Sequence, residues 1–179
     1  MISGSASRRY ARAILSIGQA QDNLEPLTAE VERLAQSIDS STDLRTVLLN
    51  PAFSQTQRQA VLEQVCQRLA LSKTTQSLAQ LLLSRGRLPN LPGIARSLRQ
   101  MVDEVAGRIR VRLVSAKPLD AAAETRIRSA LSKATGKTVL CDKSVDESLI
   151  GGVITQVGDV IYDGSIKGQL ASLKTRWQG

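Results

Sequence analysis

The hydrophobic pattern of this chain changes its period at Gly107, and this change limits the possible folds more than any other feature. Up to residue 106, apolar residues recur every three or four positions, which is the spacing of one face of an α-helix. From residue 108 to residue 113, arginine alternates with an aliphatic residue, as in a β-strand with one basic and one apolar face. We therefore predict two domains, a helical one over residues 1–106 and an α+β one over residues 107–179.

Six helices are predicted in the first domain, because short breaks separate six apolar stripes. Asn50-Pro51 ends the third helix, since the residue before a proline avoids the helical region. Ser54 and Gln57 have the spacing of a capping box, and Ser72 can cap the next helix. Six helices with short links predict a compact bundle. The first stripe consists of Tyr10, Ala13, Ile14 and Ile17, and the fifth contains Leu78, Leu81 and Leu82.

The second domain is predicted to hold a short sheet and two helices. Gly136 would end a helix over residues 120–135, and a final helix would start near Ser165. The predicted fold class is therefore α+β, an N-terminal six-helix bundle followed by a small C-terminal α/β domain with a short sheet and a terminal helix. Strands are expected at residues 108–113, 137–141, 150–157 and 160–162, the last two joined by a tight turn at Gly158-Asp159. The stripe of the final helix would be Ile166, Leu170, Leu173 and Trp177.

The composition limits which residue types can form the core, but it does not identify a binding partner. Hydrophobic residues make up 42% of the chain and aromatic residues 2%, so the core must be built from Leu, Ile, Val and Ala, which suits packed helices. The net charge of +8 divides into +3 before Gly107 and +5 from Gly107 onward. Such a surface permits binding to nucleic acid, acidic lipids or an acidic protein, or simply favours solubility. The arginines before Asp22 also have the composition of an organellar presequence, but we interpret this segment as a folded helix.

Residue types that several chemistries require are missing from the sequence. There is no histidine, so a zinc site or a Ser–His–Asp triad lacks its usual ligand or base. Cys66 and Cys141 are far apart, and no CxxC spacing exists. No apolar run approaches the roughly 18 to 20 residues of a membrane span. We therefore expect no catalytic residue, no metal, no cofactor and no insertion into a membrane.

The glycines between residues 151 and 168 invite a phosphate-loop interpretation, but their spacing fits neither common nucleotide-binding glycine motif. Turn roles are favoured instead, with Gly158 in a hairpin and Gly164 at the entry to a helix. The nearby acids could form a carboxylate metal site or an acid/base pair, but acids beside glycine are ordinary in turns. The expected roles are turn caps for Asp142 and Asp146 and hairpin flanks for Asp159 and Asp163.

The arginines of residues 108–112 could contact phosphate groups. Nucleic-acid modules usually add aromatic side chains for base stacking, and none lies near this strand. A solvated face of a sheet is therefore favoured. A basic RNA-binding or ribosome-associated protein is kept as the alternative function, and a small phosphotransfer enzyme is a third hypothesis that depends only on the glycines and acids.

Two of the predicted helices carry apolar residues on more than one side. The fifth has three consecutive leucines at residues 81–83, and the first has Ala11, Leu15 and Gly18 beside its main stripe. Helices of this kind either lie at the centre of a bundle or form a groove for a partner helix. The pattern alone leaves both possibilities open.

The stretch from Leu149 to Leu170 resembles the C-terminal signature of the delta subunit of F-type ATP synthases, whose mitochondrial counterpart is the oligomycin-sensitivity-conferring protein. In that family an apolar-Gly-Gly strand leads to Gly-Asp, then Asp-Gly-Ser, then a final helix. The resemblance covers essentially the whole chain. Further matches, in order, are Tyr10-Ala11-Arg12-Ala13, Leu49-Asn50-Pro51 with Arg58, Gly86-Arg87-Leu88, and Ser115-Ala116 with Pro118-Leu119.

This resemblance implies a non-catalytic stator subunit that ties the catalytic head to the peripheral stalk, so that rotor torque is resisted during proton-driven ATP synthesis. It implies one copy in a large hetero-oligomer, no nucleic acid, and a place on the cytoplasmic face of a bacterial inner membrane or the equivalent face of a thylakoid or mitochondrial membrane. The first and fifth helices would bind the N-terminal helix of an alpha subunit through Tyr10, Ala13, Ile14, Ile17, Leu78, Leu81 and Leu82. The C-terminal domain would bind the b-type stalk subunits, with Ile166, Leu170, Leu173 and Trp177 as candidates that could instead be buried in their own domain.

Overall fold

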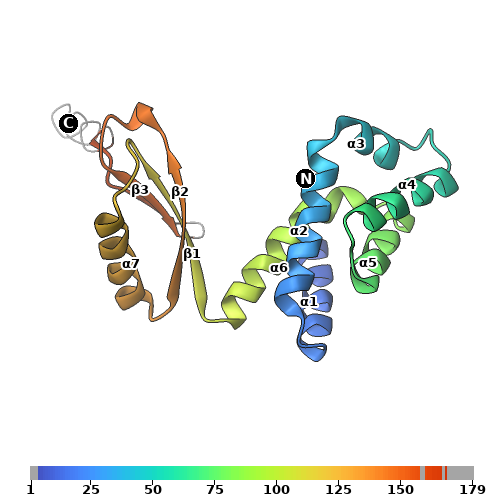
Figure 1. Cartoon of the computed structure of the whole chain (residues 1–179), viewed down its shortest axis with the longest axis horizontal. Helices are drawn as coiled ribbons and strands as arrows, with labels where there is room; N and C mark the ends of the chain where they lie inside the picture. Colours follow the sequence, from blue (N-terminus) through green and yellow to red (C-terminus); the bar gives the residue numbers. More distant parts are fainter. Residues whose placement is uncertain (1–3, 158–159, 167, 169–179) are drawn as a thin grey trace. The chain divides into compact units, whose positions relative to one another are not determined.

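The computed structural model describes residues 4–157, 160–166 and 168, and the chain divides into two compact units, Met1–Val102 and Asp103–Gly179 (Figure 1). The boundary falls within the last helix before Gly107. This helix begins in the first unit, and its last turn belongs to the second unit. The predicted assignment of residues 1–106 and 107–179 to different partners stays a prediction.

The first unit is helical, and its helices follow the predicted stripes. Its core is aliphatic, and the largest fully buried side chains are mostly leucines, as the low aromatic content requires. The elements are α1 (Gly4–Ala20), α2 (Leu24–Ser40), α3 (Thr42–Leu49), α4 (Gln55–Arg68), α5 (Lys73–Ser84), the short 3-10 helix η1 (Leu88–Asn90) and α6 (Leu91–Val105).

The helix boundaries in the first unit have local causes that the sequence predicts. The backbone N–H of Gln57 donates to the hydroxyl of Ser54 at 3.2 Å, and the N–H of Ser54 donates to the side chain of Gln57 at 2.9 Å, which completes the capping box of α4. Ser72 caps α5 by accepting from the N–H of Thr75. Helix α3 stops before Asn50, whose ψ of 122° is extended. These three predictions are confirmed.

The second unit is a mixed four-stranded sheet with one helix among the described residues. The strand order is β2-β1-β3-β4, with β1 parallel to β2 and the other two pairs antiparallel. The elements are β1 (Arg108–Ser115), α7 (Ala121–Thr135), β2 (Thr138–Val145), the 3-10 helix η2 (Glu147–Leu149), β3 (Val153–Val157) and β4 (Val160–Asp163).

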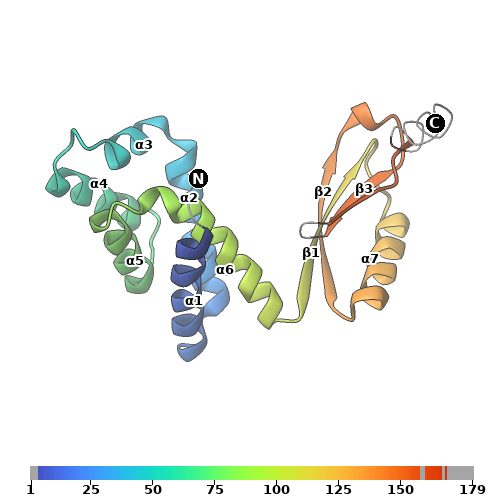
Figure 2. The same ribbon diagram turned by 180° about the vertical axis from the view of Figure 1, so that it is seen from behind.

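Helix α7 connects the two parallel strands and lies along the sheet (Figure 2). Val111 and Leu113 of β1 and Val139 of β2 form the buried centre, with Ile127 and Leu131 of α7 packed against them. The arginines of β1 alternate with these buried residues, so the predicted apolar and basic faces are confirmed.

Three details differ from the prediction. Strand β2 continues to Val145, because all eight residues of β1 find a partner in it. Strand β3 begins at Val153 rather than Ile150, because the backbone turns at Ile150 (φ +64°) and Gly152 (φ +83°). The helix of the second unit in the described ranges is α7, so the fold is a helical part followed by a mixed sheet with one helix, not a six-helix bundle followed by a domain with a terminal helix. Most of the predicted final helix, like the turn at Gly158-Asp159, lies outside the described residues.

Gly152 is required by the close approach of a second segment, and Gly151 lies against the same segment. A Cβ at Gly152 would overlap the carbonyl oxygen of Gly164, and a Cβ at Gly151 would meet the side chain of Ile166. Two hydrogen bonds hold the segments together, from the N–H of Gly164 to the oxygen of Val153 at 3.1 Å and from the N–H of Ile166 to the oxygen of Gly151 at 3.0 Å. The glycine signature therefore has a structural cause.

Substitution of Gly152 tests this close approach. Gly152→Ala should lower the free energy of unfolding of the second unit by about 3 kcal/mol, because left-handed strain and the overlap with Gly164 add together. Gly136→Ala is the matched control, since Gly136 has φ +67° with open space around it, and it should cost about 1 kcal/mol. Urea unfolding of the full chain followed by circular dichroism measures both. Equal losses would contradict the packing argument.

Candidate partner-binding site

The structure divides the seven residues predicted on α1 and α5 into an inner and an outer set. Ile14, Leu78 and Leu82 are buried in the core of the first unit. Tyr10 is half-buried, and Ala13 is exposed. Ile17 and Leu81 are exposed by 38% and 44%. We call Tyr10, Ala13, Ile17 and Leu81 the outer set.

One side-chain contact joins α1 to the segment after α5. Arg87 Nη1 donates to the Tyr10 hydroxyl at 3.0 Å, and the guanidinium carbon lies 5.9 Å from the centre of the Tyr10 ring. Helices α1 and α5 lie near one another in both views of the ribbon (Figures 1 and 2). This contact was not predicted, because sequence spacing gives no sign that Tyr10 and Arg87 meet.

A carboxylate on α2 fixes the N-terminus of α5. One oxygen of Glu30 accepts from the N–H of Ser72 at 2.9 Å, from its hydroxyl at 2.6 Å, and from the Thr75 hydroxyl at 2.6 Å. Burial by itself would raise the pKa of Glu30, but the hydrogen bonds from Ser72 and Thr75 outweigh it and lower the pKa. A negative charge here also favours the α5 dipole. The position of Ser72 before an apolar stripe predicts a cap, but nothing in the local sequence connects Ser72 to Glu30.

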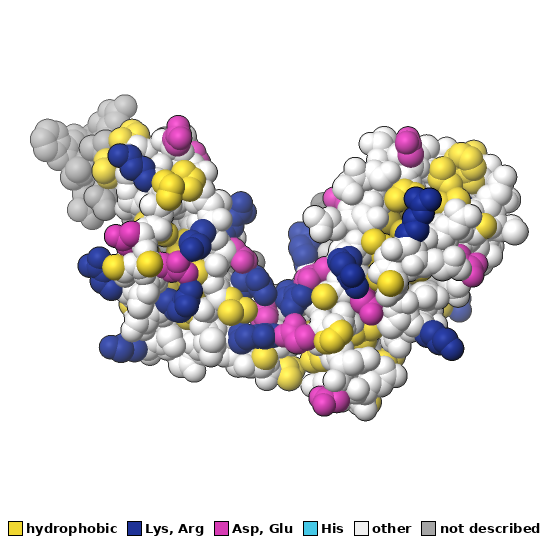
Figure 3. Space-filling view, in the orientation of Figure 1, with side chains coloured by type: hydrophobic (Ala, Val, Ile, Leu, Met, Phe, Trp, Pro, Cys, Tyr) yellow, Lys and Arg dark blue, Asp and Glu magenta, His cyan; other side chains and the backbone are white. Residues whose placement is uncertain are grey.

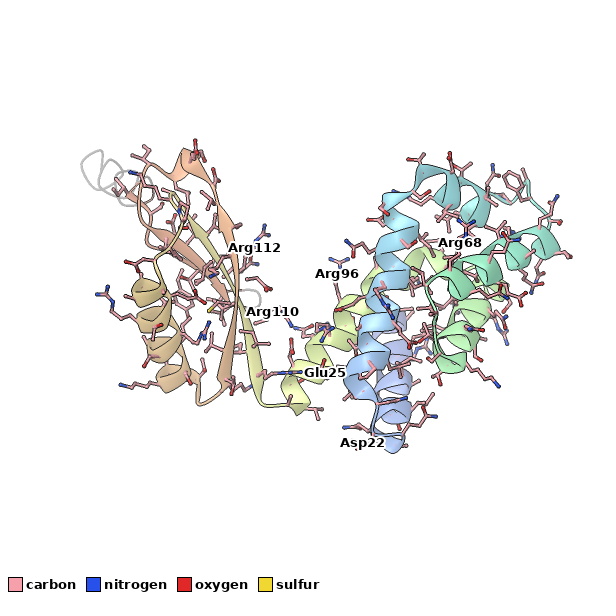
Figure 4. The ribbon with its side chains drawn as sticks, in the orientation of Figure 1. Asp22, Glu25, Arg68, Arg96, Arg110 and Arg112 are labelled. Carbon is pink, nitrogen blue, oxygen red and sulfur yellow. The ribbon has the colours of Figure 1, made fainter. Side chains whose placement is uncertain are left out.

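A second polar contact ties α6 to α2. Arg99 donates to both oxygens of Glu32 at 2.7 and 2.5 Å and to Glu25 at 2.9 Å. The hydrogen bond to Glu32 raises the pKa of Arg99 above its ordinary value. Glu25 is labelled in Figure 4, near the start of α2. Together, the Glu30 and Arg99 contacts fix α5 and α6 against the same helix.

In the second unit, only one of the four predicted stalk-binding residues can be placed. Ile166 is exposed by 45%, while Leu170, Leu173 and Trp177 lie outside the described residues. Hydrophobic side chains reach the surface of this unit in the space-filling view (Figure 3). The further exposed large hydrophobic residues of the unit are Val145, Ile150, Val160, Ile161 and Tyr162.

From the sequence, Ile150, Val160, Ile161 and Tyr162 were predicted only as parts of strands, and Val145 lay outside every predicted strand. The sequence did indicate that one of these side chains would be exposed, because Val160 and Ile161 are adjacent and cannot both point to the same face of a strand. In the structure both are exposed, because β4 is an edge strand of the sheet.

The arginines of β1 are engaged within their own unit. Asp103 is only 5% exposed and lies 3.4 Å from Arg108 Nε and 3.3 Å from Arg110 Nε. Nη1 of Arg110 also lies 3.5 Å from Oδ2 of Asp142. Figure 4 labels Arg110 and Arg112 on β1. Because two of the three arginines have carboxylate partners, this strand is a poor candidate for phosphate binding.

The acids of the second unit have structural partners where they are described. Asp142 lies within β2 and pairs with Arg110, so its predicted role as a turn cap is wrong. Asp146 accepts from the N–H of Ser148 at the start of η2, as predicted. Asp163 accepts from the N–H of Ser165, and hydrogen bonding to Ser165 lowers the pKa of Asp163. Asp159 lies outside the described residues.

Among the residues that the structure describes, no group of three or more potential metal ligands occurs. Cys66 is a free, buried cysteine, and burial raises the pKa of its thiol. None of the described helices has both the length and the apolar composition that a bilayer-spanning segment requires.

The two units define a class of fold, a helical unit followed by an α+β unit with a mixed four-stranded sheet, and large hydrophobic side chains are exposed on both units. Comparison with known proteins agrees. Residues 6–176 match the family described as ATP synthase delta (OSCP) subunit. The chain is 44% identical to the ATP synthase subunit delta of Anaeromyxobacter dehalogenans over 97% of both chains, and 41% identical to that of Geobacter metallireducens over 95% of this chain and 94% of the relative.

A chain in the cryo-EM structure of the Toxoplasma gondii mitochondrial ATP synthase hexamer shares the fold, with a TM-score of 0.71, 24% identity and 97% coverage of both chains. The chain belongs to the ATP synthase delta (OSCP) subunit family and is a non-catalytic stator subunit of ATP synthase. The functional hypothesis drawn from the sequence is confirmed, and neither RNA binding nor phosphotransfer is supported.

The Glu30 contact predicts a specific response to pH. Because the folded-state pKa of Glu30 is below its ordinary value of 4.5, its contribution to stability is present above about pH 4.5 and is lost as the pH falls through the folded-state value. Glu30→Gln should therefore cost about 1 kcal/mol at pH 7 and much less at pH 3. Urea unfolding at both pH values measures this difference. Glu63→Gln on the exposed face of α4 is the control, and an equal pH response in both variants would contradict the prediction.

Proposed function

We propose that this stator subunit links the catalytic head to the peripheral stalk through two separate surfaces. The helical unit binds the N-terminal helix of an alpha subunit, and the second unit binds the end of the b-type stalk subunits. One copy serves the whole hetero-oligomer. Its place is peripheral, on the cytoplasmic face of a bacterial inner membrane or the equivalent face of an organelle membrane.

The observation that carries the proposal is the exposure of Ala13, Ile17 and Leu81 beside the buried residues of the core. Ile17 and Leu81 lie one helical turn from the buried Ile14 and Leu78, so the apolar stripe of each helix continues from the core to the surface. An incoming amphipathic helix can extend that core by covering the exposed side chains. The small side chain of Ala13 allows the backbone of such a helix to approach α1 closely.

The second surface is supported by Ile166 and Ile150, which are exposed near the glycine signature. Ile166 is held by its backbone bond to Gly151, and Ile150 is exposed by 69% with a left-handed φ of +64°. A β-branched residue rarely adopts this conformation, and strained residues with exposed apolar side chains often belong to binding sites. The role of this family as a stator subunit indicates that the end of a stalk helix binds at this surface.

A connector of this kind works by mechanical attachment and needs no reacting side chain. Torque from the rotor would spin the catalytic head unless a stator holds it, so the useful property is slow dissociation at both surfaces. Apolar burial suits this purpose, because it is not weakened by salt as surface ion pairs are.

Ala13→Asp tests the head-binding surface. We expect a synthetic peptide of the alpha subunit N-terminus to bind the full chain, and Ala13→Asp to weaken that binding at least tenfold, because a carboxylate would be buried against an apolar helix face. Isothermal titration calorimetry measures both affinities. Ala60→Asp, on the exposed face of α4, is the matched control and should bind as the parent chain does. Failure of the parent chain to bind the peptide would refute the assignment.

Ile166→Ser tests the stalk-binding surface. Loss of an apolar contact should weaken binding of a soluble fragment of the b-type subunits about fivefold to tenfold, without effect on the alpha peptide. Val160→Ser is the control, because Val160 is similarly exposed at the far end of β4. Surface plasmon resonance with the immobilised full chain measures the two affinities. Equal losses from both variants would show that the docking position is wrong.

A further inference from the structure

Two neighbouring residues near the end of α6 belong to different units. The side chain of Val102 is 2% exposed and lies in the aliphatic core of the helical unit. Asp103 is 5% exposed and pairs with arginines of β1, so it belongs to the sheet unit. A single peptide bond therefore separates a core side chain of the first unit from an ion pair of the second.

The link that follows, residues 104–107, is not held by apolar packing. All four residues are exposed, and Val105 is exposed by 56%. Gly107 has φ +62° with open space around it, and glycine has the greatest backbone freedom of all residues. The N–H of Gly107 donates to the oxygen of Glu104 at 3.1 Å, and the N–H of Thr138 donates to the oxygen of Gly107 at 3.0 Å. Backbone bonds at such an exposed link open easily, because water can replace either partner.

The carboxylate of Asp103 spans this link and reaches the strand beyond it. Its Oδ1 lies 3.4 Å from Nε of Arg108, and its Oδ2 accepts from Nε of Arg110 at 3.3 Å. The side chain of Asp103 is 8% exposed, and those of the two arginines are 27% and 40% exposed. Arg110 also pairs with Asp142 of β2, so the contacts extend from the end of α6 across two strands. Because the carboxylate is buried, water and salt screen these pairs less than they screen surface pairs.

We propose that Asp103 and the two arginines form a clamp that keeps the link closed when force passes through the chain. The chain crosses between the units once, within α6, so a load carried from one partner-binding surface to the other must pass through this link. With the clamp in place, the load enters β1 through side chains as well as through the backbone of Gly107. This inference rests on the proposed function, in which the two units bind different partners.

The geometry makes the two ion pairs act together. Arg108 and Arg110 are two positions apart on a strand, so both side chains leave the same face of β1. Opening of the link moves Asp103 away from both guanidinium groups at once. The cost of opening is therefore greater than that of one surface ion pair, which contributes little by itself.

Amide hydrogen exchange of the full chain, detected residue by residue by NMR, tests the clamp. Asp103→Asn should speed exchange of the Gly107 and Thr138 amides about tenfold, because the link opens more often once the charge is lost. The amide of Val111, at the centre of the sheet, should exchange as in the parent chain. Glu104→Gln is the matched control, since Glu104 is the adjacent exposed acid on the same turn, and it should change none of these rates.

Two outcomes of the exchange experiment would overturn the inference. One is an unchanged rate at Gly107 and Thr138 in Asp103→Asn. The other is an equal acceleration at Val111, because Asp103 would then stabilise the whole unit and not the link. If Asp103→Asn does not fold, Arg110→Gln decides by the same criteria, since it removes a partly exposed partner and leaves the carboxylate paired with Arg108.

Behaviour under load is measured by stretching single molecules of the full chain. Handles are attached to Gln36→Cys on α2 and Lys133→Cys on α7, both exposed positions, after Cys66 and Cys141 are replaced by alanine. Asp103→Asn should open the link about tenfold more often at a given force, and Glu104→Gln should not. Equal opening rates in the parent chain and Asp103→Asn would overturn the inference. Neither measurement uses a partner, so failure of the alpha peptide or the stalk fragment to bind would refute the proposed function separately.

Discussion

Burial of aliphatic side chains is the interaction on which the helical unit depends. Leu34 on α2, Leu82 on α5 and Leu98 on α6 have no exposed surface, and each contributes about 1.5–3 kcal/mol by leaving water. A typical hydrogen bond contributes about 1 kcal/mol, so the leucines hold the helices together. The polar contacts have another effect, because Glu30 and Arg99 have defined geometry and fix where α5 and α6 lie against α2.

The same two effects, stability from apolar burial and defined position from polar contacts, are found at the surface. Ile17 and Leu81 extend the core outward and can supply affinity for another helix, while Tyr10 and Arg87 have an orientation that apolar groups lack. A stator subunit must hold its partner in one alignment against torque.

The sequence allowed much of the local structure to be predicted, because local structure depends on near neighbours. The stripes on α1 and α5, the caps at Ser54 and Ser72, and the alternation of β1 each involve residues within a few positions of one another. The prediction was wrong where a distant residue decides the outcome. Asp142 was expected in a turn, but pairing of β2 with β1 draws it into a strand beside Arg110.

The glycine-rich stretch illustrates the same limit. Its spacing disfavoured a nucleotide-binding loop, and its resemblance to the delta family indicated the function, but neither explained why glycine is needed at residue 152. The reason is a contact with Gly164, twelve positions away, that leaves no room for a Cβ.

The sequence by itself determined that the chain has a helical part and an α+β part, that its core is aliphatic, and that its family is that of the delta subunit. These properties depend on periodicity, composition and motifs, which are written along the chain. Only the tertiary structure decided which residues of the predicted groove are buried and which reach the surface, and that Arg87 meets Tyr10 while Glu30 meets Ser72. Such contacts join residues 42 or more positions apart, and no local pattern encodes them because packing of the whole unit brings them together.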